Sequence, residues 1–113
     1  MNIQIYGKTK CFDTKKAERY FKERGIKFQF IELDKMGFSP REYETVSRCV
    51  GGFKNLIDDK SKEYEKSFMA YLAYDDEKEQ KLLDNPKLFK TPIVRNGKFA
   101  TVGFKKEVWD LWE

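Results

Sequence analysis

Residues 2–33 read NIQIYGKTKCFDTKKAERYFKERGIKFQFIEL, and this stretch decides the fold. Residues 2–6 alternate isoleucines with polar neighbours, which predicts a short strand. Residues 12–24 carry apolar side chains at helical spacing, and Gly25 follows where a helix commonly ends. Residues 27–33 alternate again and predict a second strand with both faces covered. A strand, a helix and a strand in succession form a βαβ unit, whose crossover should be right-handed.

The C-terminal third returns to strand-forming residues. Residues 92–95 and 98–102 flank Asn96-Gly97. Asn-Gly between two strands predicts a β-hairpin, because both central residues of a type I′ turn need a positive φ. After Gly103 we expect a final helix, which carries the apolar residues Val108, Trp109, Leu111 and Trp112.

Between these two regions, residues from about 39 to 88 predict an insertion of about three helices. Ser39-Pro40-Arg41-Glu42 begins the first helix, with serine as the N-cap and glutamate placed for a capping box, and Gly51-Gly52 ends it. An apolar stripe predicts the second helix and comprises Tyr64, Phe68, Tyr71 and Leu72. A third, short helix should begin at Asp75 or Asp76 and stop at Asn85-Pro86. No break in composition marks a linker, so we expect one domain over residues 1–113.

Composition excludes several classes of function. The chain has no histidine, which removes histidine-based nucleophile activation and acid–base chemistry, and two cysteines cannot build a four-cysteine zinc site. We therefore expect no bound metal or cofactor. The net charge is +4, but the charges alternate in sign, so we expect no direct contact with nucleic acid. No apolar run has the length of a membrane helix or signal peptide, so we expect a soluble, cytoplasmic protein.

Cys11 is the first candidate for chemistry. It lies between the first predicted strand and the first predicted helix, where orphan backbone N–H groups favour a thiolate. Lysines surround it in sequence, while Asp13 disfavours an anion. The alternative is a buried cysteine that packs as a small apolar side chain. The flanking lysines are Lys8, Lys10, Lys15 and Lys16.

Two further positions leave alternatives open. Cys49, in the predicted insertion, is either a partly buried helix cysteine or a thiol that resolves a disulfide on Cys11. Sequence alone does not bring the two sulfurs within bridging distance. Thr91-Pro92 stands at the start of a predicted strand, where proline serves either as an edge-strand device or as a cis residue positioned by the fold.

These residues in this order resemble the ArsC-like family, the arsenate reductase-related and Spx-type branch of the thioredoxin-like fold. The stretches that carry the resemblance are IYGKTKCFDTKKAERYF, GIKFQFIELD and DNPKLFKTPIVRNGKFATVGF. It implies an α/β fold with a four-stranded mixed sheet in the order β-α-β, helical insertion, β-β-α. It also implies that Cys11 is the nucleophile, that Pro92 is a cis-proline facing it, and that Lys15 belongs to a common basic pair. Thr14 falls where redox relatives carry the second cysteine of C-x-x-C.

The sequence departs from the family at its anion-binding positions. Arsenate reductases of this family hold the oxyanion with three arginines, and the matching positions here are Asp58, Thr91 and Phe104. Lys60 or Arg95 would have to replace them, because arsenate needs charge-assisted donors. Threonine before the cis-proline resembles glutaredoxins instead.

Three functions follow from the resemblance. The first is a monothiol reductase that uses Cys11 with glutathione or another small thiol as co-substrate, and that works as a monomer on thiol or disulfide substrates. The second is an Spx-like regulator that docks on RNA polymerase, with Gly51-Gly52 near the docking loop. The third is a relative that has kept the fold and lost the activity.

Overall fold

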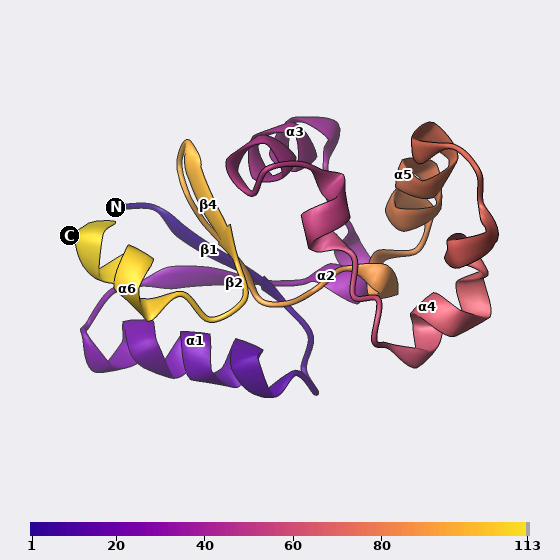
Figure 1. Cartoon of the computed structure of the whole chain (residues 1–113). Helices are drawn as coiled ribbons and strands as arrows, with labels where there is room; N and C mark the ends of the chain where they lie inside the picture. The colour runs from indigo at the N-terminus through magenta and orange to yellow at the C-terminus, as the bar shows by residue number, and fades with distance from the viewer. Residues whose placement is uncertain (113) are drawn as a thin grey trace.

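A four-stranded mixed sheet forms the centre of the protein in a computed structural model that describes residues 1–112 (Figure 1). The strands lie in the order β2-β1-β3-β4. β1 and β2 pair in parallel, whereas β3 runs antiparallel to both β1 and β4. The mixed sheet and the β-α-β start are therefore confirmed. The strands are β1 (Ile3–Gly7), β2 (Phe28–Glu32), β3 (Ile93–Asn96) and β4 (Phe99–Val102).

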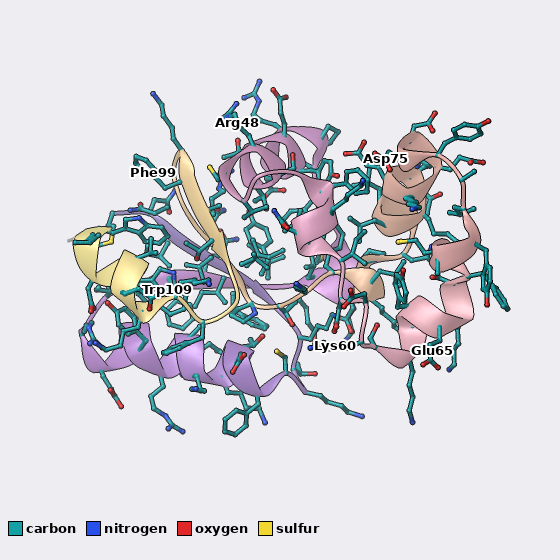
Figure 2. All side chains as sticks on the ribbon, viewed as in Figure 1. Arg48, Lys60, Glu65, Asp75, Phe99 and Trp109 are labelled. Carbon is teal, nitrogen blue, oxygen red and sulfur yellow. The ribbon has the colours of Figure 1, made fainter. Side chains whose placement is uncertain are left out.

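One face of the sheet is covered by α1 (Phe12–Glu23) and α6 (Lys106–Trp109), as Figure 1 shows. The apolar stripe of α1 packs on alternate residues of the strands, because side chains one residue apart in a strand point to opposite faces. Trp109 lies in this core and donates from its indole Nε1 to Thr101 Oγ1 at 2.8 Å (Figure 2). The buried members of this core are Ile3, Ile5, Ala17, Tyr20, Phe21, Val94 and Trp109.

The insertion covers the other face and extends beyond the end of the sheet (Figure 1). Its second core includes Tyr6, Ile93 and Ala100 from the strands. The elements between β2 and β3 are α2 (Leu33–Met36), α3 (Pro40–Cys49), η1 (Phe53–Leu56), α4 (Lys62–Ser67), η2 (Met69–Tyr71), α5 (Asp75–Asp84) and η3 (Pro86–Leu88). A last 3₁₀ turn, η4 (Asp110–Trp112), follows α6.

The capping box at the start of α3 is present. Glu42 N donates to Ser39 Oγ at 3.3 Å, and Ser39 N donates to Glu42 Oε1 at 3.1 Å. Two otherwise unpaired backbone N–H groups are satisfied in this way, which fixes the first residue of the helix. Among the described residues, no helix is long and apolar enough to cross a membrane.

The second predicted helix of the insertion is shorter than its apolar stripe suggested. α4 ends at Ser67, whose hydroxyl donates to Tyr64 O at 2.7 Å and accepts from Met69 N at 3.2 Å. This side chain competes with the helical backbone pattern, and Phe68 then adopts a left-handed conformation with φ of 57°. As a result Phe68 and Tyr71 point into solvent with exposed fractions of 66% and 84%. Periodicity alone could not reveal this break.

The hairpin is present, but its turn differs from the expected one. Asn96 pairs with Phe99, so Gly97 and Lys98 form the two-residue loop. Of these two residues only Gly97 has a positive φ, at 60°, which is the pattern of a type II′ turn. Asn96 completes β3, and the type I′ turn centred on Asn96-Gly97 was therefore a wrong prediction.

Candidate active site around Cys11

Cys11 is the N-cap residue of α1, in the loop that follows β1. Its backbone is extended, its carbonyl accepts from Lys15 N at 3.3 Å, and its own N–H donates to Lys8 O at 3.0 Å. The turn therefore holds the cysteine at the positive end of a 12-residue helix. The sequence signal for this position was the switch from alternating to helical periodicity.

The thiol of Cys11 faces Thr91, in the segment that leads into β3. Cys11 Sγ lies 3.5 Å from Thr91 O, and the Thr91–Pro92 peptide bond is cis. Burial raises the pKa of the thiol, but hydrogen bonds to the thiolate outweigh burial and hold the pKa below its ordinary value. These bonds come from the Thr14 and Thr91 side chains and from the backbone N–H groups of Thr14 and Asp13.

Thr14 lies beneath Cys11 and is almost fully buried, with 1% of its surface exposed. Its Oγ1 has no fixed partner within residues 1–112, so the hydroxyl is free to donate when Cys11 is ionised. Gly7 makes room for it: a Cβ on Gly7 would lie 2.3 Å from Thr14 Cγ2. The end of β1 and the first turn of α1 are thus packed in contact, which fixes the thiol over the strand end.

Among the lysines that flank Cys11 in sequence, Lys8 is the one whose ammonium is held at the candidate site. Its Nζ donates to Lys87 O and Phe89 O, both at 2.8 Å. Burial lowers the pKa of Lys8, while attraction to Asp58 and to a Cys11 thiolate opposes the shift. Lys8 therefore places a positive charge near Cys11, although its ammonium is held by backbone carbonyls. Lys10 and Lys15 are exposed, so solvent screens their attraction for a thiolate.

A groove of about 790 Å³ opens beside Cys11. Thr91, Asp58, Phe104 and Cys49 are among the residues that line it. Its lining carries both signs of charge and includes Lys90, Lys105, Asp13 and Glu107. Among residues 1–112, no group of three or more cysteine and carboxylate side chains is arranged to hold a metal ion.

Comparison with known proteins identifies the family. The model of the ArsC family matches residues 6–111. The chain belongs to the ArsC family. A relative named global transcriptional regulator Spx 2, from Oceanobacillus iheyensis, is 30% identical over 95% of this chain and 80% of its own length.

Solved structures with the same ArsC fold include an ArsC family related protein from Bacteroides fragilis. It has a TM-score of 0.86 and 21% identity, and covers 100% of this chain and 98% of its own. An arsenate reductase from Vibrio cholerae has a TM-score of 0.83 and 22% identity, with 97% of each chain covered. The fold is thioredoxin-like, as the sequence resemblance implied.

The three positions at which the ArsC resemblance places arginines converge on the groove. Asp58, Thr91 and Phe104 come from three distant parts of the chain, and all of them line it. The structure therefore brings these positions together, but with one carboxylate, one hydroxyl and one phenyl ring in place of three guanidinium groups. Such a wall does not supply the bidentate donors that an arsenate dianion requires.

Neither basic residue expected to replace those arginines lines the groove. Arg95 pairs with Gln4 and Ala100 in the sheet, and its charge acts on Tyr6 and Glu42. Lys60 is exposed in the loop before α4, where its N–H donates to Asp58 Oδ1 at 3.4 Å (Figure 2). The strand register explains the position of Arg95, because each residue along β3 moves a side chain about 3.3 Å from Pro92.

Arg95 belongs to a different contact, between the sheet and the insertion. Tyr6 Oη donates to Glu42 Oε2 at 2.5 Å. Burial, and then the hydrogen bond to Glu42, raise the pKa of Tyr6, and the nearby Arg95 opposes the shift. This contact joins β1 to the first turn of α3 and lies away from the thiol.

Cys49 shares the groove with Cys11 and lies at its other end. It is the last residue of α3, and its Sγ donates to Lys98 O at 3.0 Å. Gly103 and Lys98 flank β4 at its two ends and are five residues apart, a span of about 16 Å in a strand; Gly103 is the end near Cys11, since its N–H donates to Pro92 O beside Thr91. Both cysteines are free, and a bridge between them would need a large rearrangement. The sequence offered no signal that placed Cys49 in the groove.

Proposed function

We propose that this protein is a monothiol oxidoreductase in which Cys11 carries out thiol–disulfide exchange and glutathione or another small thiol restores it. The observation that supports this most directly is the set of donors around Cys11 Sγ. Thr14, Thr91 and the first N–H groups of α1 favour the thiolate, and the thiolate is the nucleophile in disulfide exchange. The exposed groove gives a substrate access to it.

The reaction has two displacement steps. The Cys11 thiolate attacks one sulfur of a disulfide, a new S–S bond forms to Cys11, and the other sulfur leaves as a thiolate that takes up a proton. A glutathione thiolate then attacks Cys11 Sγ in the mixed disulfide, which releases Cys11 as a thiolate and leaves the attacking glutathione in a new disulfide. Over a cycle with a glutathionylated substrate, one molecule of glutathione is consumed and oxidised glutathione is produced.

The absence of a nearby second thiol supports an external reductant. Thr14 occupies the place of the second cysteine in C-x-x-C, and Cys49 lies at the far end of the groove. A protein thiol therefore cannot resolve the mixed disulfide without a rearrangement. Thr14 is used instead as a hydrogen-bond donor to the thiolate.

Arsenate is a poorer fit as the substrate. It carries up to two negative charges near neutral pH, and the attacking thiolate is also negative. The helix dipole supplies only about 0.3–1 kcal/mol when exposed, while Asp58 adds repulsion within the groove. A disulfide is neutral at its reacting sulfur and needs no cationic clamp.

The test is mass spectrometry of the protein incubated with oxidised glutathione, beside an assay for arsenite production from arsenate. We expect one glutathione adduct, located on Cys11 and absent from Cys11→Ser, with little or no arsenite. Robust arsenite production that depends on Cys11 would overturn the proposal. So would a wild-type protein that forms no adduct.

A second candidate function is regulation through RNA polymerase, supported by the 30% identity to a relative named as an Spx regulator. Gly51 and Gly52, which follow α3, both have positive φ, at 87° and 116°. This conformation disfavours residues other than glycine. Binding to purified RNA polymerase that is lost in Gly52→Arg, in a protein inactive in disulfide exchange, would favour this function.

A further inference from the structure

The groove beside Cys11 runs along the free edge of the sheet. Four consecutive residues of β4 and its end, Ala100 to Gly103, line it. Successive side chains of a strand point to opposite faces, so a groove lined by consecutive residues must border the strand edge. β4 is the outer strand of the sheet in the described part of the chain. Val50 lines the groove on the insertion side of this edge, and Val108 lines it on the side of α6.

The strand register identifies which backbone groups point into the groove. Gly103 N donates to Pro92 O at 2.8 Å, so Gly103 is bonded toward β3. In an antiparallel pair, residues bonded toward the neighbouring strand alternate with residues whose N–H and C=O point away. Ala100 and Val102 therefore direct their N–H and C=O groups to the edge.

Cys49 marks the end of this open edge. Its thiol donates to Lys98 O, which is the next outward-pointing carbonyl in the same alternation. The groove thus runs from Cys11 to Cys49 over about 16 Å, the length of about five residues of extended chain. Glutathione, with three residues, is shorter than the groove.

We propose that the groove binds an extended polypeptide segment of the disulfide substrate, which pairs its backbone with the outward groups of Ala100 and Val102 while its cysteine reaches Cys11. This inference rests on the proposed exchange function. Strand addition at a sheet edge obtains affinity from backbone hydrogen bonds and tolerates varied side chains, which suits a groove with both charges on its walls. The favoured substrate is then a protein or peptide disulfide, and free glutathione disulfide occupies only the end near Cys11.

The chemical step can be followed without an added reductant. A peptide cysteine is first capped as a mixed disulfide with a coloured aromatic thiol. The Cys11 thiolate attacks the peptide sulfur, the S–S bond to the aromatic thiol breaks, and that thiol leaves as a coloured thiolate with the electron pair. Single-turnover release of colour measures the rate of this step.

The experiment compares capped glutathione with capped peptides that carry zero, two, four or six residues on either side of the cysteine. We expect an increase in kcat/KM of about tenfold as the chain on one side grows to four residues, as about two added hydrogen bonds would give, and no further rise beyond that. Rates that do not depend on peptide length would overturn the inference and leave the exchange function intact. Reaction with neither class of substrate would overturn both.

Two matched pairs of variants show which part of the groove causes the dependence on peptide length. For every variant we compare the rate with a long capped peptide to the rate with capped glutathione, as a ratio. Val102→Pro removes the outward N–H, which edge strands tolerate, whereas Val102→Ala keeps it. Cys49→Trp fills the far end of the groove, whereas Cys49→Ser keeps the size of the side chain and a donor for Lys98 O. We expect the ratio to fall toward one in Val102→Pro and Cys49→Trp and to persist in both controls. A ratio unchanged in a folded Cys49→Trp, checked by thermal melting, would contradict the proposed path of the peptide.

Discussion

The two cysteines line one groove, yet they occupy opposite ends of helices. Cys11 precedes the first turn of α1, where backbone N–H groups point at its sulfur, and Cys49 is the last residue of α3, where the unpaired groups are carbonyls. Cys11 Sγ accepts from Thr14 and Thr91 when ionised, whereas Cys49 donates its proton to Lys98 O. As a thiol, Cys11 also donates to Thr91 O at 3.5 Å, so the two sites differ in the donors that surround the Cys11 thiolate and not in having a carbonyl acceptor.

For stabilisation of the Cys11 thiolate, the position of the cysteine on the backbone therefore matters more than the number of nearby lysines. Lys10 and Lys15 are exposed, and Lys8 is held by the carbonyls of Lys87 and Phe89. The groups whose hydrogen bonds lower the pKa of Cys11 are hydroxyl and amide donors, and Thr14 among them is held by the close packing of Gly7. Substitution and titration of these groups test the difference between Cys11 and Cys49.

The largest difference between the two cysteines should appear in the exchange rate when each sulfur is removed in turn. We expect Cys11→Ser to lower the rate of mixed-disulfide formation with oxidised glutathione by at least about a hundredfold, because the attacking atom is lost. Cys49→Ser should change that rate by less than about twofold, since its thiol is not the nucleophile. Stopped reactions analysed by intact-mass spectrometry give both rates. Comparable losses in the two variants would mean that Cys49 takes part in the exchange.

The next effect is the difference in alkylation rate. Between about pH 6 and 7, Cys11 in Cys49→Ser should react with iodoacetamide about tenfold faster than Cys49 in Cys11→Ser, because only Cys11 has donors directed at its sulfur. As pH falls through the lowered pKa of Cys11, its rate should fall with the fraction of thiolate. Equal rates at every pH would return Cys11 to the class of structural cysteines.

A smaller change is expected from Thr14→Val, which removes the buried hydroxyl and keeps the shape of the side chain. Without this donor the pKa of Cys11 should rise, and the alkylation rate at neutral pH should fall about threefold to tenfold. Ultraviolet titration of the thiolate measures the pKa directly. Thr14→Ser is the matched control, since it keeps the hydroxyl and should keep most of the reactivity. If the pKa of Cys11 in Thr14→Val equals that of the wild type, the Thr14 hydroxyl does not stabilise the thiolate.

The smallest effect concerns stability. The pKa of Cys11 is lowered by folding, so its ionised form adds stability that is fully present above the unfolded-state pKa and is lost as pH falls through the folded-state pKa. The free energy of unfolding of the wild type, relative to Cys11→Ser, should therefore rise with pH across this interval and level off above it. Urea denaturation at a series of pH values measures the difference. A flat difference would mean that folding does not stabilise the thiolate.

Local sequence signals predicted those parts of the molecule that local chemistry controls. The alternation around Ile3 and Ile5, the helical spacing after Cys11 and the capping box at Ser39 each depend on neighbours in sequence, and all of these elements are present. The cysteine at the start of α1 was predictable for the same reason. The paired strands of the hairpin followed from their flanking residues, even though the turn type did not.

The features that local sequence signals did not predict depend on contacts that the spacing of residues does not show. The end of α4 at Ser67 depends on a side-chain bond that periodicity does not reveal, and it exposes Phe68. Strand register moves Arg95 away from the thiol, and the packing of α3 against β4 brings Cys49 into the groove. Neither position follows from spacing along the chain, because both are set by tertiary packing.

The contact between Cys11 and Thr91 joins residues 80 positions apart. On the ribosome, Cys11 is made long before Thr91, and the pairing of β1 with β3 cannot form until most of the chain has been synthesised. A nascent or unfolded chain has no donor from Thr91 and no ordered α1, so its Cys11 titrates as an ordinary thiol. The hydrogen bonds that lower the pKa of Cys11 are therefore assembled only in the completed fold, and the cysteine of a growing chain is less ionised than that of the folded protein.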